Sequence, residues 1–118
     1  MVVQKILKMK VEQKGHTTII RNTQGNTADF QSKIVQEYNS FKSKNLILDL
    51  SHDKNITMQD IKSFADIAKQ HKKGKKSLVL VTDTVDFNTV PISITVVPTL
   101  LEAHDIIEMD EIARDLGF

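Results

Sequence analysis

Alternating polar and apolar residues open the chain, and continuous apolar runs follow them. Ile6–Gln13 alternates with a period of two, which predicts a strand with one buried face. Lys14-Gly15 suits a tight turn, and the β-branched run Thr17–Ile20 predicts the second strand of a hairpin.

Apolar residues at helical spacing predict a helix over about Thr27–Phe41. A second helix is predicted from Thr57, where Thr57–Asp60 resembles a capping box with Asp in place of Glu, to a C-cap at Gly74. Its expected buried face consists of Ile61, Phe64, Ala65 and Ala68.

A final helix is expected after the capping box Thr99–Glu102, ending at Gly117. A break into two short helices is expected near Glu108–Asp110. The candidates for its buried face are Leu101, Ile106 or Ile107, Ile112, Ala113 and Leu116.

Two uninterrupted apolar runs, Asn45–Leu50 and Leu78–Val81, predict central strands covered on both faces. Ile92–Val97 lies between Pro91 and Pro98, which favours an edge position. The expected order is β-β-α-β-α-β-β-α. This order predicts an α/β fold with a mixed sheet of four or five strands and packed helices, in a single domain over residues 1–118. Residues 1–8 are expected to extend the first strand or to form a loose terminus.

Composition and charge narrow the function classes. The 118 residues are 40% hydrophobic and carry a net charge of +1, which gives no electrostatic case for nucleic acid or an anionic membrane. The absence of cysteine excludes a thiolate nucleophile, a disulfide and a cysteine metal site. No signal peptide and no membrane span is recognisable, so a cytoplasmic location is expected.

The hairpin, the helix, and the strands Leu46–Ser51 and Ser77–Val81 together resemble a STAS domain, the family of sulfate transporters and anti-sigma-factor antagonists. Pro98–Ala103 is similar to the start of the family's last helix. The likeness covers roughly Met9–Ile107. It implies a bacterial, cytoplasmic, non-enzymatic regulator that binds a protein partner such as a kinase or an anti-sigma factor, without a cofactor.

The sequence departs from that family at the regulatory motif. Anti-sigma-factor antagonists carry Asp-Ser-Ser-Gly at the start of the helix that follows this strand, and a partner kinase phosphorylates one of the serines. The corresponding residues here are Thr57-Met58-Gln59-Asp60, which place Gln59 at the phosphoacceptor position. The resemblance therefore implies a contact surface at which the usual switch is absent or moved.

Polar residues follow the strand that ends at Leu50, at the edge where open α/β sheets usually place their sites. The candidate partner-contact surface comprises Asp49, Ser51, His52, Asp53, Thr57, Met58, Gln59 and Asp60. The loop Asp83–Val90 is a possible addition to this surface. Thr57 is the best remaining phosphoacceptor, because a phosphate there would lie at a helix N-terminus; otherwise Thr57 serves only as an N-cap. Asp49 could bind a metal, accept a phosphate or bind a partner loop, or it could accept backbone N–H groups of the following loop.

The histidines, the glycines and the lysine run give weaker indications of a functional site. The four histidines do not share a metal-ligand spacing, and the four glycines are too scattered to form a phosphate loop, so no metal or cofactor site is predicted. The basic run Lys72–Lys76 could contact nucleic acid or an acidic partner, but a solvated helix end is the expected reading, because no aromatic platform accompanies it.

The last eleven residues, Glu108–Phe118, are similar to the ends of short chains that carry the name ribonuclease Z. That nuclease needs a His-x-His-x-Asp-His cluster holding two metals, and Ser51-His52-Asp53 is the nearest approach to it here. The residues therefore do not support that activity.

A regulatory protein-binding module without enzymatic activity is the leading hypothesis. A small-ligand binder or enzyme that uses Asp49, His52 and Asp53 is the alternative. A weaker alternative is an accessory protein in RNA processing that uses the lysine run and is associated with ribonuclease Z.

Overall fold

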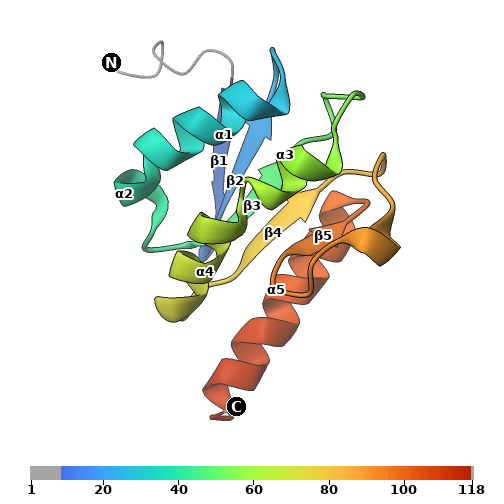
Figure 1. Ribbon diagram of the computed structural model, residues 1–118. Helices are drawn as coiled ribbons and strands as arrows, with labels where there is room; N and C mark the ends of the chain where they lie inside the picture. The colour runs from blue at the N-terminus through green and yellow to red at the C-terminus, as the bar shows by residue number, and fades with distance from the viewer. Residues whose placement is uncertain (1–8, 118) are drawn as a thin grey trace.

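A five-stranded mixed sheet forms the centre of the computed structural model, which describes residues 9–117 (Figure 1). The strands follow one another in the sheet in the order in which they occur along the chain. β1 is antiparallel to β2, and the remaining pairs are parallel. They are β1 (Met9–Lys14), β2 (Thr17–Asn22), β3 (Asn45–Asp49), β4 (Leu78–Val81) and β5 (Thr95–Val97). The predicted α/β class with a mixed sheet and packed helices is confirmed, while residues 6–8 of the first predicted strand lie outside the described residues.

The helices differ in length from the predicted ones. The helices are α1 (Thr27–Gln36), α2 (Tyr38–Phe41), α3 (Met58–Lys62), α4 (Ala65–Lys73) and α5 (Leu100–Asp115), with a 3₁₀ turn, η2 (Phe87–Thr89). The first two predicted helices are each divided, at Glu37 and at Ser63-Phe64. The break expected near Glu108–Asp110 is wrong, because α5 is continuous.

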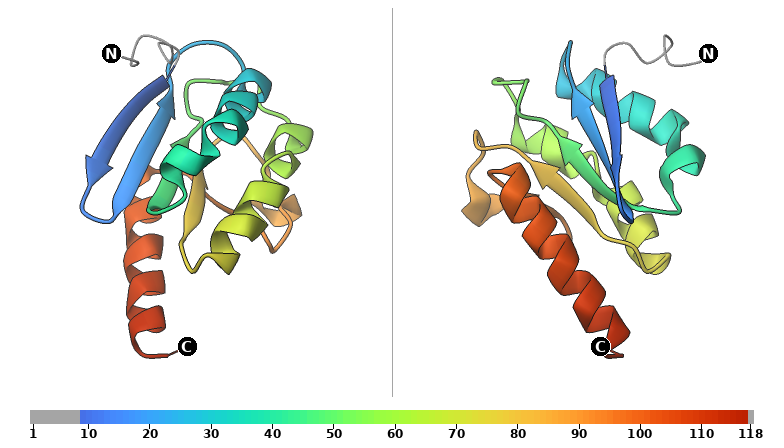
Figure 2. Two further views of the ribbon diagram at one scale, coloured as in Figure 1. Left: turned by 90° about the vertical axis from the view of Figure 1, so that its left-hand side faces the viewer. Right: turned by 180° about the vertical axis from the view of Figure 1, so that it is seen from behind.

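Both faces of the sheet are covered, although unequally (Figure 2). Helices α1 to α4 lie on one face and enclose the larger apolar cluster around Leu46, Leu48 and Leu80. On the other face α5 alone covers a smaller cluster that includes Ile47 and Val79. Successive side chains of a strand point to opposite faces, so the interior of β3 and all of β4 must be apolar. All residues of these two strands are buried, which explains their uninterrupted apolar runs.

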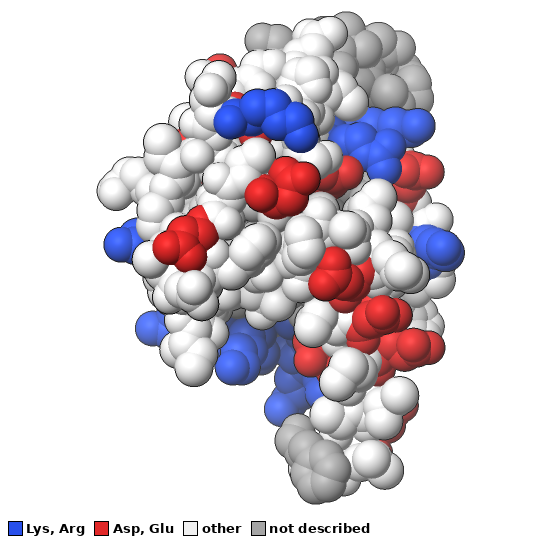
Figure 3. All heavy atoms as spheres, turned by 90° about the vertical axis from the view of Figure 1, so that its right-hand side faces the viewer, with Lys and Arg blue, Asp and Glu red and all other residues white. Residues whose placement is uncertain are grey.

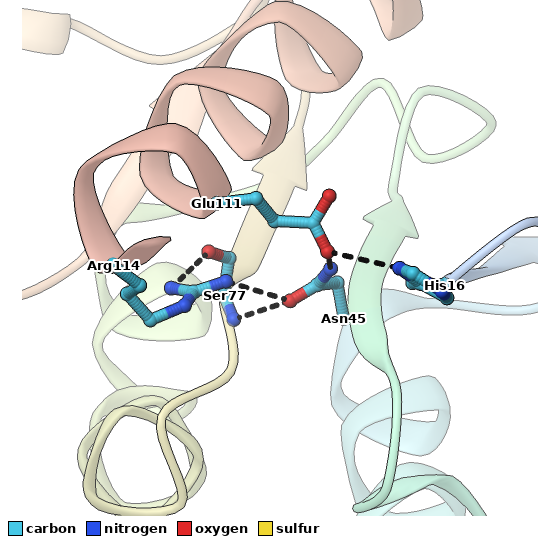
Figure 4. A network of polar contacts seen from close by, with 5 residues as sticks. All are labelled: His16, Asn45, Ser77, Glu111 and Arg114. Atoms are coloured by element: carbon cyan, nitrogen blue, oxygen red, sulfur yellow. Dashed lines mark hydrogen bonds and ion pairs between the residues drawn. The ribbon is translucent and has the colours of Figure 1, made fainter. Parts of the chain in front are cut away.

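Polar contacts fix the C-terminal half of α5 to the edge of the sheet where β3 and β4 begin (Figure 4). The buried Asn45 accepts hydrogen bonds through Oδ1 from the Ser77 backbone N–H at 2.9 Å and from Arg114 Nη2 at 3.3 Å. Its Nδ2 donates to Glu111 Oε2 at 2.9 Å, and His16 Nδ1 lies 3.5 Å from the same oxygen. Arg114 also donates to Ser77 Oγ at 3.2 Å. Asn45 therefore joins β3, β4 and α5 at one point.

We expect Asn45→Ala to lower the free energy of unfolding by about 1–3 kcal/mol, because it leaves the buried Ser77 N–H without its acceptor. Urea denaturation measures this change. Asn88→Ala, on the exposed turn η2, is the matched control and should change stability by no more than about 0.5 kcal/mol. Equal effects of the two substitutions would contradict the proposed role of Asn45.

A buried histidine connects the helices on the larger side of the sheet. His71 of α4 lies 2.7 Å from the Tyr38 hydroxyl through Nδ1 and 2.7 Å from the Lys44 carbonyl through Nε2. Because a carbonyl only accepts, Nε2 carries the hydrogen and Nδ1 accepts from Tyr38. Burial lowers the pKa of His71, and the charges of Lys76 and Arg114 lower it further, against the opposing effect of the Lys44 carbonyl. Burial also raises the pKa of Tyr38, so both groups are neutral at pH 7.

This lowered pKa predicts that stability decreases as the pH falls below 6.5, the ordinary histidine value, because the unfolded chain binds the proton more tightly than the folded one. The loss should level off once the pH is below the folded-state pKa. Urea denaturation between about pH 7.5 and pH 5 measures the slope. His71→Gln should flatten this slope, because it removes the group whose pKa is lowered in the folded chain. A slope that survives His71→Gln would show that another group is responsible.

Candidate functional site

The candidate site lies at the edge of the sheet where the parallel strands end. The loop between β3 and α3 emerges there, together with the loops that follow β2 and β4 (Figure 1). Asp49 is the last residue of β3, and Met58 begins α3, so the intervening loop carries most of the predicted contact residues. How each side chain is held decides what this edge can do chemically.

The carboxylate of Asp49 is occupied by hydrogen bonds from neighbouring residues. Its buried carboxylate accepts from Arg21 Nε at 3.0 Å through Oδ2. Through Oδ1 it accepts from the backbone N–H of Ser51 at 3.0 Å and from Ser51 Oγ at 2.6 Å. Arg21 lies directly opposite Asp49 in the parallel register of β2 and β3. Of the alternatives for Asp49, the geometry favours hydrogen bonding to the following loop. The ion pair with Arg21 was not predicted from the sequence.

Asp53 ties the same loop to the start of α1. Its Oδ2 accepts from the backbone N–H and from Oγ1 of Thr27, both at 2.8 Å, and its Oδ1 accepts from the Asn55 N–H at 2.9 Å. Burial by itself would raise the pKa of Asp53. The hydrogen bonds from Asn55 and Thr27 and the nearby His52 outweigh it, so the pKa is below the ordinary value of 3.8. Asp53 is therefore ionised at neutral pH and engaged in holding the loop.

His52 precedes Asp53 in the sequence, and its charge contributes to the lowered pKa of that carboxyl group. His52 is exposed, and within residues 9–117 its side chain has no hydrogen-bond partner. Asp49, His52 and Asp53 therefore do not converge on a common point, since each carboxylate faces its own donors. No three acidic or histidine side chains within residues 9–117 are grouped so that they could hold a metal ion.

The first turn of α3 is closed by a reciprocal pair of capping hydrogen bonds. Thr57 Oγ1 accepts from the Asp60 N–H at 3.2 Å, and Asp60 Oδ2 accepts from the Thr57 N–H at 3.0 Å, which confirms the predicted capping box. Ile56 before the cap and Ile61 in the next turn belong to the same buried cluster, in the positions of a hydrophobic staple. This arrangement leaves Thr57 and Gln59 exposed, while Met58 is half-buried against the core.

A phosphate on Thr57 would meet an unfavourable neighbour. Asp60 already receives the Thr57 N–H, so its carboxylate lies beside the position that the phosphate would occupy. Two negative groups at that separation repel each other and would break the capping box. The structure thus favours the role of Thr57 as an N-cap.

The basic run Lys72–Lys76 lies at the opposite end of the parallel strands, where β3 and β4 begin. Lys72 in the last turn of α4 and Lys75 and Lys76 just after the helix line a hollow of about 390 Å³ together with Arg114 and Gly117. Gly74 is the C-cap of α4 as predicted, but the left-handed backbone conformation falls on Lys75. The lysine run is therefore remote from the loop that follows β3.

Comparison with known proteins adds no relative: no family model matches the chain, and no curated protein matches it. Among residues 9–117, none of the helices is both long and apolar enough to cross a membrane.

We expect Asp53→Ala to lower the free energy of unfolding by about 1–3 kcal/mol, because the buried Thr27 N–H and hydroxyl lose their acceptor. Thermal or urea denaturation measures the loss. Asp83→Ala, which removes an exposed carboxylate from the loop after β4, should have a small effect. If Asp53→Ala is as stable as Asp83→Ala, Asp53 does not hold the loop.

Proposed function

We propose that this chain is a non-enzymatic regulatory module that binds a protein partner through the loop after β3 and the first turn of α3. The observation that carries the proposal is the capped first turn of α3, whose hydrogen bonds define the backbone that presents the exposed Gln59 at the edge of the sheet. A preorganised, exposed surface needs little ordering when it binds, so it retains more of its interaction energy.

The chemistry of the neighbouring side chains supports binding over catalysis. A general base or a nucleophile must be free to reach a reacting atom. Asp49 and Asp53 instead accept hydrogen bonds from Arg21, Ser51, Thr27 and Asn55. These carboxylates shape the loop and leave its outer polar groups for a partner.

The resemblance to anti-sigma-factor antagonists supports the same surface. The resemblance rests on the sequence of the hairpin, the first helix and the strands Leu46–Ser51 and Ser77–Val81. In that family the start of the corresponding helix carries the phosphorylated serine. Because Gln59 occupies this position, we propose that partner binding here is constitutive, without serine phosphorylation.

Affinity purification from native cells tests the proposal, with wild type, Gln59→Arg and a matched control, Gln70→Arg. Both glutamines are exposed, and only Gln59 lies on the proposed surface. We expect wild type and Gln70→Arg to retain a common partner and Gln59→Arg to recover it at least about tenfold less, because a long cation replaces a central contact.

Phosphosite mapping on the same sample should find no phosphate on Thr57, the one hydroxyl in the four residues at the motif position. A partner that binds Gln59→Arg as well as Gln70→Arg would contradict the proposed surface. Stoichiometric phosphate on Thr57 would contradict constitutive binding.

A further inference from the structure

Helix α5 has two apolar faces, and within residues 9–117 only one of them is covered. Ala103 and Ile107 face the sheet and are buried. The sequence predicts burial for Leu101, Ile112 and Leu116 and assigns no face to Met109. All four side chains are exposed, with exposed fractions of 73% for Leu101, 65% for Met109, 55% for Ile112 and 67% for Leu116. At about 3.6 residues per turn, these four side chains fall within roughly 80° of the circumference, opposite the buried face. We call this set, with Asp105 at its centre, the outer face of α5.

The predicted burial of Leu101, Ile112 and Leu116 is wrong because these side chains lie on the side of α5 that faces away from the sheet. The sheet below α5 is short, and the C-terminal half of the helix extends past the edge where β3 and β4 begin (Figure 2). Apolar exposure of this extent along one helix face marks an interaction site more often than a solvated surface.

The charges around the outer face have one sign. Asp105 lies within it, and Glu108 and Asp115 lie along one side at helical spacing. None of these three carboxylates has an ion-pair partner within residues 9–117. Arg114, the only Lys or Arg in α5, is turned toward Asn45 and Ser77. Figure 3 shows acidic side chains gathered beside uncharged surface on the side of the molecule where α5 lies.

This charge pattern disfavours a second copy as the occupant. Two α5 helices packed antiparallel about a twofold axis would set the Glu108 and Asp115 side of one copy against the same side of the other. A parallel pair would bring Asp105 against Asp105 at the centre of the interface. Both arrangements place like charges together, at a cost in affinity.

The outer face of α5 over residues 101–116, in which Asp105 lies between Leu101 and Met109, extends about 22 Å at 1.5 Å per residue, which matches the length of a docked helix. We propose that the outer face of α5 binds a basic amphipathic helix of a partner protein, with its apolar side on Leu101, Met109, Ile112 and Leu116 and its lysines or arginines beside Glu108 and Asp115. This site lies on the opposite face of the sheet from α3, and it is separate from the surface under the proposed function.

Two synthetic helical peptides of about 18 residues test the site. Both present the same leucine stripe, and one has lysine where the other has glutamate at every remaining position. Fluorescence anisotropy with the full-length chain should show saturable binding of the lysine peptide and at least about tenfold weaker binding of the glutamate peptide. Added salt should weaken the binding of the lysine peptide.

Ile112→Lys should weaken binding of the lysine peptide at least about tenfold, because it places a cation in the apolar stripe. Val35→Lys is the matched control, because Val35 is 46% exposed and lies on α1, away from this face. This variant should bind the lysine peptide as the wild-type chain does. Circular dichroism should show both variants folded.

Three results would overturn the proposal: no saturable binding of the lysine peptide, equal affinity for the two peptides, or equal effects of Ile112→Lys and Val35→Lys. Sedimentation of the chain alone provides a further check. A micromolar dimer that Ile112→Lys dissociates would assign the face to a second copy and overturn the assignment to a basic partner. Gln59→Arg should leave peptide binding unchanged, so the two surfaces can fail separately.

Discussion

Burial of β3 and β4 on both faces is the constraint on which the rest of the fold depends. Two strands without a solvent-facing side require cover from two directions, which α1 to α4 provide on one face and α5 provides alone on the other. Their backbone polar groups pair within the parallel sheet. Where the strands begin and end, polar side chains must complete the hydrogen bonding, because buried donors and acceptors are costly to leave unpaired.

The two ends of β3 meet this requirement in different ways. At its start, Asn45 joins the adjacent strand and the covering helix in one buried network. At its end, Asp49 and the nearby Asp53 hold the following loop through donors on β2 and α1. Two carboxylates at the edge where open α/β sheets usually place their sites therefore act as structural supports, and Gln59 is left exposed beside them.

Local patterns in the sequence predicted much of this arrangement. The apolar runs, the hairpin and the Thr57–Asp60 capping box depend on neighbouring residues, and each can be recognised from spacing alone. The partners of Asp49 and Asn45 could not be predicted, because Arg21 and Arg114 are 28 and 69 residues away and reach them only through strand register and helix placement. Periodicity likewise could not tell which of the two apolar faces of α5 meets the sheet, so Leu101, Ile112 and Leu116 were assigned to the wrong side.

The most direct test of the central claim is the pKa of the Asp53 carboxyl group, measured by ¹³C NMR titration. If Asp53 is a structural tie to Thr27 and Asn55, its pKa lies below the ordinary value of 3.8, and its protonation perturbs the Thr27 amide. Stability that depends on this tie is then present above pH 3.8 and is lost as the pH falls through the folded-state pKa. A pKa at or above 3.8, with an unperturbed Thr27 amide, would mean that the carboxylate is free, and would contradict the account of this edge as a support for binding.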